Sequence, residues 1–370
     1  MSTYTRSDAP RDNFGDETAE VDAPVKAPKK RKGFRGLARW KRALIIIGIV
    51  LFTFVGGGTA AAFGLLSRYE GAVHHDDLMG DAAAPPAVTE EHWEGGPLNF
   101  LLLGSDSRAG ETDKGVVAGE RSDTIMLVHI SAKRDSATII SIPRDSYVMI
   151  PESKGRKAGM NKLNAAFAFG GAPLAVKTVS QLTGITLDGA MIASFAGIRT
   201  MVDAVGGVEV CLDFDVKSTF SNTTWKKGCQ QMDGKTAEEF MRNRKSVPGG
   251  DFGRMHDQQL VVRGIINKVS KGGLLENPLA FDKLLITAAQ SLTIDKTIDL
   301  RALAASVKNI RPDNVKFGTV PYSNDDLKTS AGSAVQLDEA QSKELFDAMR
   351  NDAMDAFFAA HPAPSDKPVA

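Results

Sequence analysis

Short apolar runs follow one another closely in the middle of the chain and indicate β-strands. The first three span residues 98–103, 123–131 and 136–142, and each has the length and aliphatic content of a buried strand. Only the four residues "AKRD" separate the second run from the third, which predicts a β-hairpin. Two later runs, 208–212 and 315–321, add further strands.

Segments in which apolar residues recur every three or four positions predict helices after these strands. They span residues 161–170, 172–184, 195–207, 233–244, 255–270, 279–292, 299–310 and 337–359. Strands mixed with many helices favour an α/β fold, in which helices cover both faces of a central mixed sheet. We therefore expect a single α/β/α layered domain over residues 97–360, with its main motifs in 97–270, and a flexible tail at 361–370.

An uncharged apolar stretch precedes this domain. Residues 43–66, "ALIIIGIVLFTFVGGGTAAAFGLL", contain no charged side chain. A helix of that length, rising about 1.5 Å per residue, covers the roughly 30 Å hydrocarbon core of a bilayer. Nine basic residues and no acidic residue lie between Lys26 and Arg42, which predicts a cytoplasmic N-terminus, one transmembrane helix and an extracellular domain. A buried core helix or a cleaved signal peptide is the alternative, although signal peptides have apolar regions of about 7 to 15 residues.

The segments on either side of this predicted helix are short of large apolar residues. Residues 1–42 are rich in Pro, Asp, Lys and Ala and predict a disordered cytoplasmic tail. Residues 67–96 contain "DAAAPPAVTE" and predict an extracellular linker. The whole chain carries 45 basic and 45 acidic side chains, and membrane topology and anionic lipid explain its basic run. Nucleic acid is therefore not an expected partner.

Both cysteines, Cys211 and Cys229, lie in the part of the chain that is expected outside the cell. An oxidising compartment favours a disulfide between them, which would close the hydrophilic stretch that separates them into a surface loop. Two free thiols are the alternative. A metal site is disfavoured because no histidine lies nearby.

Arginine and aspartate occur together at the ends of three neighbouring predicted strands. The pairs are Asp106 with Arg108, Arg121 with Asp123, and Arg144 with Asp145, and a later cluster contains Arg242, Arg244, Asp251, Arg254, Gln258 and Gln259. A solvated turn or a weak surface ion pair explains any one of them. Their recurrence at strand ends that a hairpin brings together indicates a shared site.

Phosphate recognition is the chemistry that suits such a site. A guanidinium is permanently charged and its planar fork matches phosphate oxygens, so several converging arginines predict a multiply charged anion such as a pyrophosphate. Carboxylates can hold a hard divalent cation that bridges the phosphates, and we assign Asp106 and Asp123 to Mg²⁺ or Mn²⁺. Asp145 is interpreted as orienting an arginine. The sequence contains no HExxH motif, nucleophile elbow or GxxxxGK[ST] loop, and His129, in mid-strand, is interpreted as packed or solvent-facing.

Six stretches resemble the LytR-CpsA-Psr family of bacterial cell-envelope proteins, in its actinobacterial form. In order, they are "NFLLLGSDSR", "RSDTIMLVHI", "ISIPRDSYV", "KLNAAFAFGG", "VDAVGGVEV" and "MDGKTAEEFMRNR…GDFGRMHDQQ". The resemblance implies an anchored enzyme that moves a glycopolymer from a polyprenyl-pyrophosphate carrier to peptidoglycan as a phosphodiester. It implies pyrophosphate contacts from Arg121, Arg144, Arg242, Arg244, Arg254 and Gln258, and catalytic roles for Asp106, Asp123 and Arg144. Phe167 and Phe169 would line a tunnel for the isoprenoid tail, with core packing as the alternative.

One position departs from the family pattern. The family often has Arg-x-x-Arg-Gln-Gln where this chain has "RMHDQQ", so Asp257 replaces the second arginine while Arg254 is retained. Two other functions use the same site: a non-catalytic lipid-pyrophosphate binding module or envelope regulator, and a polyprenyl-pyrophosphate pyrophosphatase with water as the acceptor.

Overall fold

The computed structural model describes most of the expected extracellular domain. The described residues are 74–81, 95–105, 122–244, 249–271, 286–287, 290–299, 303, 306–307 and 309–361, and all of them belong to one compact unit, Ala61–Ala370. The expected cytoplasmic tail and transmembrane helix lie outside the described residues, as do 362–370 of the expected flexible tail. Within the described ranges, no helix is both long enough and apolar enough to span a bilayer.

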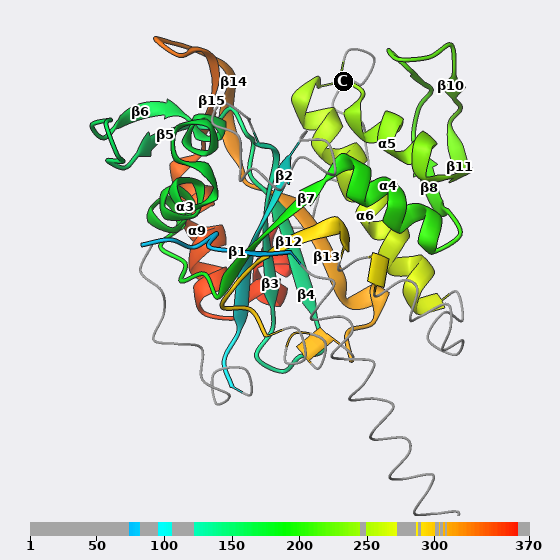
Figure 1. Cartoon of the computed structure of the whole chain (residues 1–370), viewed down its shortest axis with the longest axis horizontal. Coiled ribbons are helices and arrows are strands. Elements are labelled where there is room, and N and C mark those ends of the chain that lie inside the picture. The colour runs from blue at the N-terminus through cyan, green and yellow to red at the C-terminus, as the bar shows by residue number, and fades with distance from the viewer. Residues whose placement is uncertain are drawn as a thin grey trace, which may run out of the picture. The chain divides into compact units, whose positions relative to one another are not determined.

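A seven-stranded mixed sheet forms the centre of this unit (Figure 1). The strand order is β1-β12-β7-β2-β3-β4-β13, with bounds His74–Asp76, Leu292–Asp295, Gly189–Ser194, Leu98–Ser105, Ser122–Ile130, Ala137–Ser141 and Val315–Thr319. Three pairs are parallel, namely β1 with β12, β7 with β2, and β4 with β13, and the other three are antiparallel. The structure confirms the α/β class, the central mixed sheet and the antiparallel hairpin of β3 and β4.

Strand β2 shows why the sheet is covered on both faces. Leu101 and Leu103 point into a core with helices α3 (Leu163–Thr183) and α9 (Glu339–Arg350), whereas Leu98 and Phe100 belong to a core on the opposite face. Successive side chains of a strand point to opposite faces, so a continuous apolar run requires cover on both sides.

Three helices lie on the other side of the sheet from α3 and α9 (Figure 1). They are α4 (Phe195–Ala204), α5 (Gly234–Arg242) and α6 (Asp251–Lys271). Together with β8 (Val208–Leu212) they enclose a separate apolar core that contains Val202, Val208, Phe240 and Val261. Three short strands complete this lobe: β9 (Val216–Lys217), β10 (Thr224–Trp225) and β11 (Gly228–Met232).

Helix α3 joins the two helices that the sequence predicts over 161–170 and 172–184. Its backbone leaves helical geometry at Gly170 and Gly171, just before Pro173, and Gly171 has a φ of +66° that favours glycine. The helix ends at Gly184 in the left-handed conformation, as its predicted glycine stop requires. Helix α6 begins at Asp251, four residues earlier than predicted.

The C-terminal helix predicted over 337–359 is divided into α9 and α10 (Met354–Ala360). The break lies at Asp352, which has a φ of +53°. Two hairpins were not predicted. One consists of β5 (Tyr147–Ile150) and β6 (Gly159–Lys162) and precedes α3. The other consists of β14 (Tyr322–Thr329) and β15 (Gly332–Leu337) and precedes α9. Strand β14 is mostly polar and exposed, and β5 and β6 are only four residues long, so neither hairpin gives a strong apolar alternation. A short 3₁₀ helix, Pro312–Asn314, precedes β13.

The folded sheet begins within the span that was expected to be a linker. Residues 74–76 form edge strand β1, parallel to β12, and β12 itself starts at the end of a predicted helix. Asp295 at the end of β12 is fully buried, and its Oδ2 accepts hydrogen bonds from the backbone N–H groups of Leu78 and Met79, both at 2.8 Å. A distant carboxylate therefore holds this segment, which is why local composition misassigned it.

The two cysteines form a disulfide between β8 and β11, where Cys211 and Cys229 are direct cross-strand partners.

Replacing Asp295 with Ala should destabilise the fold. Its Oδ1 also accepts the Thr297 backbone N–H at 2.8 Å, but Thr297 is exposed, so the change leaves two buried backbone donors, those of Leu78 and Met79, without their acceptor. Because a buried unsatisfied donor costs about 1–3 kcal/mol, we expect the free energy of unfolding, measured in denaturant, to fall by about 3 kcal/mol or more. Asp213→Ala changes an exposed residue and should stay within about 0.5 kcal/mol. Equal stability of the two variants would contradict this role.

Candidate active site

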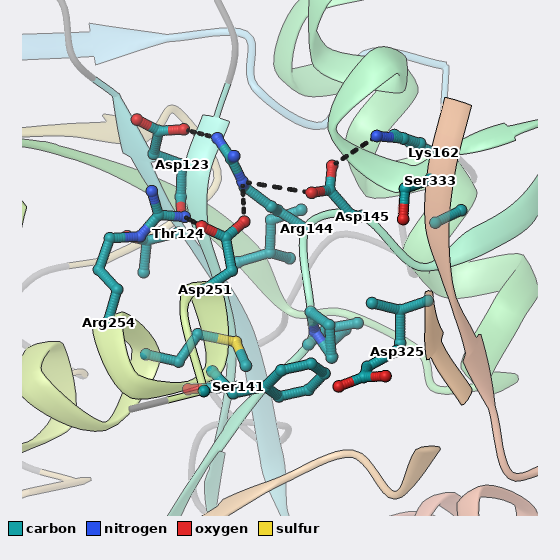
Figure 2. Close-up of a pocket in the computed structure, with 18 residues that line it drawn as sticks. Asp123, Thr124, Ser141, Arg144, Asp145, Lys162, Asp251, Arg254, Asp325 and Ser333 are labelled. Carbon is teal, nitrogen blue, oxygen red and sulfur yellow. Dashed lines mark hydrogen bonds and ion pairs between the residues drawn. The ribbon is translucent and has the colours of Figure 1, made fainter. Parts of the chain in front are cut away.

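Arg144 lies where β4 leaves the sheet, and it contacts carboxylates from two other parts of the chain (Figure 2). Its Nε donates to Oδ2 of Asp251 at 2.7 Å, and its Nη1 donates to Oδ1 of Asp123. Pro143, which precedes it, has no N–H with which to continue a strand ladder. The Arg144 carbonyl accepts the backbone N–H of Asn164, at 2.9 Å, near the start of α3. The strand end therefore places this guanidinium between two acids.

Asp123, on β3, brings together three arginines. Besides Arg144, its Oδ2 accepts from Nη2 of Arg244 at 2.7 Å, and its backbone carbonyl accepts from Nη2 of Arg254 at 3.3 Å. Arg244 follows α5 and Arg254 lies in the first turns of α6. The fold thus joins three of the segments that the sequence assigned to one site.

Arg254 is a buried cation with unused hydrogen-bonding capacity. The residue is 1% exposed, and its Nε and Nη1 have no hydrogen-bond partner, while Nη2 lies 3.4 Å from Oδ1 of Asp251. Burial lowers the pKa of Arg254 to about 10, helped by the nearby Arg144 and Arg244. An ionised group that is buried and only partly paired is costly unless a ligand completes its hydrogen bonds.

Asp251 and Arg144 hold each other in the charged state. Burial raises the pKa of the Asp251 carboxyl, but Arg254 and Arg144 outweigh that effect and hold the pKa below its usual value. Burial also lowers the pKa of Arg144, and the carboxylates of Asp251 and Asp123 overcome it, so that this pKa is raised. The pair is therefore ionised, and Asp251 is a weak base that positions the guanidinium.

Two cavities meet at Asp123 and Arg254, which line both of them. The first, of about 280 Å³, lies between the ends of β3 and β4, the start of α6 and strand β15, and Arg144 lines it. The second, of about 410 Å³, is lined by Arg242 and Arg244. Arg242 is placed at the end of α5, 3.3 Å from Oε1 of Glu238.

Two aromatic rings flank Arg242 in the second cavity. Its guanidinium carbon lies 5.8 Å from the ring centre of Phe195 and 5.7 Å from that of Phe220, distances at which a cation interacts with the ring faces. Phe220 is 58% exposed, so the second cavity combines cations with an open aromatic rim.

Gln258 and Asp257 are buried on α6 close to Arg254. Gln258 is fully buried and neither its Nε2 nor its Oε1 has a hydrogen-bond partner. It lies four residues after Arg254, hence on the same side of the helix. Asp257 is 1% exposed, and burial raises its pKa to about 8. The residue that departs from the family pattern therefore carries a proton at neutral pH and adds no negative charge.

Three of the remaining expected residues are Asp106, Arg121 and Asp145. Asp106 and Arg121 lie outside the described residues, although their sequence neighbours Ser105 and Ser122 pair across β2 and β3. Asp145 is 3.8 Å from Nε of Arg144 and 3.6 Å from Nζ of Lys162, so Asp251, rather than Asp145, makes the shorter contact that orients Arg144.

Phe167 and Phe169 line neither of the two cavities at the arginine cluster. Phe167 is buried in the core beneath α3 and Phe169 packs against that core, and both line a further cavity of about 330 Å³ beside the break in α3. Their contact with an isoprenoid stays a prediction. His129 is buried, with Nδ1 2.8 Å from Oδ1 of Asn99 and Nε2 3.0 Å from Oδ1 of Asp352. It is packed, as one of its two interpretations required.

Residues 64–351 match the LytR_cpsA_psr family. This match covers most of the chain and includes every arginine of the site. The chain belongs to the LytR-CpsA-Psr family.

Similar proteins agree with this assignment. The probable cell wall biosynthesis protein LcpB of Corynebacterium glutamicum is 32% identical over 300 residues, which cover 78% of this chain and 69% of that protein. The polyisoprenyl-teichoic acid–peptidoglycan teichoic acid transferase TagU of Bacillus mycoides is 35% identical over 225 residues, or 60% of this chain and 69% of TagU. Protein gbs0355 of Streptococcus agalactiae has a similar crystal structure, with a TM-score of 0.62 at 25% identity over 73% of this chain and 91% of that one.

The sequence assigned no role to three residues of this site, Asp251, Asp325 and Ser333. Asp251 was visible in "GGDFGR" as an acid near a predicted helix, but only the fold shows that it contacts Arg144 and Arg254. Asp325 and Ser333 line the first cavity from the β14–β15 hairpin, and nothing in that polar stretch marked them.

Asp257 should make stability depend on pH. Its folded pKa of about 8 lies above the ordinary value of 3.8, so between these pH values the folded chain keeps a proton that the unfolded chain has lost. The free energy of unfolding therefore falls as pH rises through this window, by about 1.4 kcal/mol per pH unit at most, and levels off above it. Asp257→Asn should remove this slope.

Thermal unfolding of both proteins from pH 5 to pH 9 measures the effect. We expect the Tm of Asp257→Asn to exceed that of the unmodified protein by more at pH 8 than at pH 5. Asp213→Asn, at an exposed position, should run parallel to the unmodified protein. A constant difference in Tm between Asp257→Asn and the unmodified protein across this range would show that burial does not raise the pKa of the Asp257 carboxyl.

Proposed function

We propose that this chain is a membrane-anchored phosphotransferase that moves a glycopolymer from a polyprenyl-pyrophosphate carrier to peptidoglycan, with its catalytic domain outside the cell. The observation that carries the proposal is the convergence of Arg144, Arg244 and Arg254 on Asp123, at the wall shared by two cavities. The name of TagU, a teichoic acid transferase acting on peptidoglycan, supports the same class of reaction.

The charge of the second cavity favours a diphosphate. Its charged lining among the described residues consists of Arg242, Arg244 and Arg254 with the single acid Asp123, a net charge of +2. Guanidinium forks pair with phosphate oxygens in two-point contacts. A pyrophosphate there would complete the unpartnered Nε and Nη1 of Arg254, and Gln258, which is also unpartnered, would add a polar contact.

Asp123 also has the donor chemistry for Mg²⁺ or Mn²⁺. Hard cations prefer carboxylate oxygens, and Asp123 and Asp106 would hold the ion. Among the described residues, the cluster of three with ligand spacing is Glu209 with Cys211 and Cys229, and both of its sulfurs are in the disulfide. The side chain of Asp123 accepts hydrogen bonds from Arg144 and Arg244, and these arginines would contact the phosphates when Asp123 holds an ion. The bound ion would neutralise charge on the phosphoryl oxygens.

The proposed reaction is a phosphoryl transfer. A peptidoglycan hydroxyl attacks the phosphorus that bears the glycopolymer, a new P–O bond forms, and the bond to polyprenyl phosphate breaks. The arginines stabilise charge on the phosphoryl oxygens and on the departing phosphate. The hydroxyl proton passes to a carboxylate, and Asp106 or Asp123 is our assignment for it. Asp251, which two arginines hold ionised, positions them.

Arg144→Ala should lower kcat/KM for transfer by roughly 100-fold or more, because it removes a preorganised donor to phosphoryl charge. Arg144→Lys should recover part of that loss, since lysine keeps the charge without the planar fork. The assay combines the full chain in detergent with Mg²⁺, a lipid-pyrophosphate-linked oligosaccharide and peptidoglycan fragments. Mass spectrometry then measures the phosphodiester-linked product.

Lys226→Ala is the matched control, because Lys226 is an exposed cation paired only with Asp215 among the described contacts, and it should not change turnover. Full turnover by Arg144→Ala would disprove the site assignment. Phosphate release without linkage would identify a pyrophosphatase. Tight binding of the lipid-pyrophosphate without turnover would identify a binding module.

A further inference from the structure

Two exposed methionines lie side by side on the β5–β6 hairpin. Met149 is 52% exposed and Met160 44%, and they are direct cross-strand partners. Cross-strand partners share one face of a hairpin, so the two side chains form one apolar patch. Val148 and Ile150 are buried in the domain on the opposite face. A paired apolar patch on a solvent-facing hairpin indicates a partner when a second feature agrees with it.

The turn between the two strands is that second feature. Residues 151–158, "PESKGRKA", carry three exposed basic residues, Lys154, Arg156 and Lys157, against the single acid Glu152, a net charge of +2. The neighbouring β14–β15 hairpin has the opposite balance, with Asp325 and Asp326 against Lys328. The methionine patch and the basic turn thus occur together on one hairpin and not on the next.

This hairpin also contacts the lining of the cavity beside the break in α3, which is mostly apolar but includes Asp76 and Asp77. The guanidinium carbon of Arg156 lies 3.5 Å from the ring centre of Phe169, and Phe169 lines the cavity of about 330 Å³ together with Phe167, Leu78 and Pro173. Figure 1 shows β5 and β6 beside α3, on the side of the sheet away from α4. Cationic and apolar surfaces therefore adjoin one another here.

We propose that the β5–β6 hairpin docks on an anionic lipid bilayer. Met149 and Met160 enter the boundary between headgroups and acyl chains, and Lys154, Arg156 and Lys157 lie against the headgroup phosphates. Apolar side chains flanked by basic residues are the combination that binds such interfaces, and each basic residue near an anionic surface strengthens association about fivefold. Docking would hold the first cavity, which Lys162 of β6 lines, close to the bilayer surface. It goes beyond the proposed transfer reaction and does not require it.

A fluorescent label on the hairpin tests this docking in the full chain. Ala158 is exposed and uncharged, and Ala158→Cys can be labelled selectively because the native cysteines form a disulfide. The labelled protein is reconstituted into vesicles of phosphatidylcholine, with or without phosphatidylglycerol, that contain lipid with brominated acyl chains. We expect the bromines to quench the label only when phosphatidylglycerol is present. A label at Thr200→Cys on α4, across the sheet, should not be quenched in either membrane.

Variants of the hairpin separate docking from mere proximity to the vesicle. Met149→Ser with Met160→Ser should reduce quenching to the level of the Thr200 label without changing the Tm. Neutralising the three basic residues to Gln should lower the docking constant by roughly 100-fold, whereas Lys328→Gln on the other hairpin should have no effect. Equal quenching at Ala158 and Thr200, or quenching that the methionine variants leave unchanged, would overturn the proposal. So would a label that responds to a soluble anionic polysaccharide but not to lipid.

Discussion

The carboxylate of Asp123 is the contact around which this site is organised. Three arginines from two distant parts of the chain converge on this residue, and two of them bond its side chain. Guanidinium groups brought this close repel one another, and burying them is costly unless opposite charge lies between them. Asp123 and Asp251 supply that charge. The proposed diphosphate would supply the same negative charge, because guanidinium donors fit phosphate oxygens and two donors of Arg254, Nε and Nη1, have no hydrogen-bond partner.

The sheet and helix α6 fix the positions of these charged side chains relative to one another. Strands β3 and β4 are consecutive and antiparallel, so the start of one and the end of the other lie at the same edge. Helix α6 is fastened to that edge by Gln259, whose Nε2 donates to Oγ of Ser141 at 2.8 Å and to the carbonyl of Gly318 at 2.9 Å. Phe252 adds a stacked contact with Tyr322, with ring centres 4.1 Å apart. These neutral contacts hold α6 against the sheet, and this placement buries Arg254.

The two sides of the sheet differ in their surface chemistry. On the side of α4, α5 and α6 the surface is cationic, with Arg242 between two aromatic rings. On the side of α3 lie a broken helix, a cavity with two phenylalanines in its lining, and a hairpin that combines exposed methionines with a basic turn. A substrate with a charged diphosphate and an apolar tail has matching chemistry on both sides, and the proposed docking surface lies on the side that suits the tail.

The sequence alone determined the elements with strong periodicity and the residues with unambiguous chemistry. It predicted β2, β3, β4 and α3, because continuous apolar runs and helical spacing are local properties, and Arg144, Arg254 and Asp123 stood out as charges at element ends. It could not place the polar β14–β15 hairpin, or the edge strand β1, which depends on the distant carboxylate of Asp295. Only the tertiary structure decided that Asp251, rather than Asp145, orients Arg144 and that Asp257 is buried and protonated. The reason is that distance and burial set the energy of a charge, and residues far apart in the chain determine both.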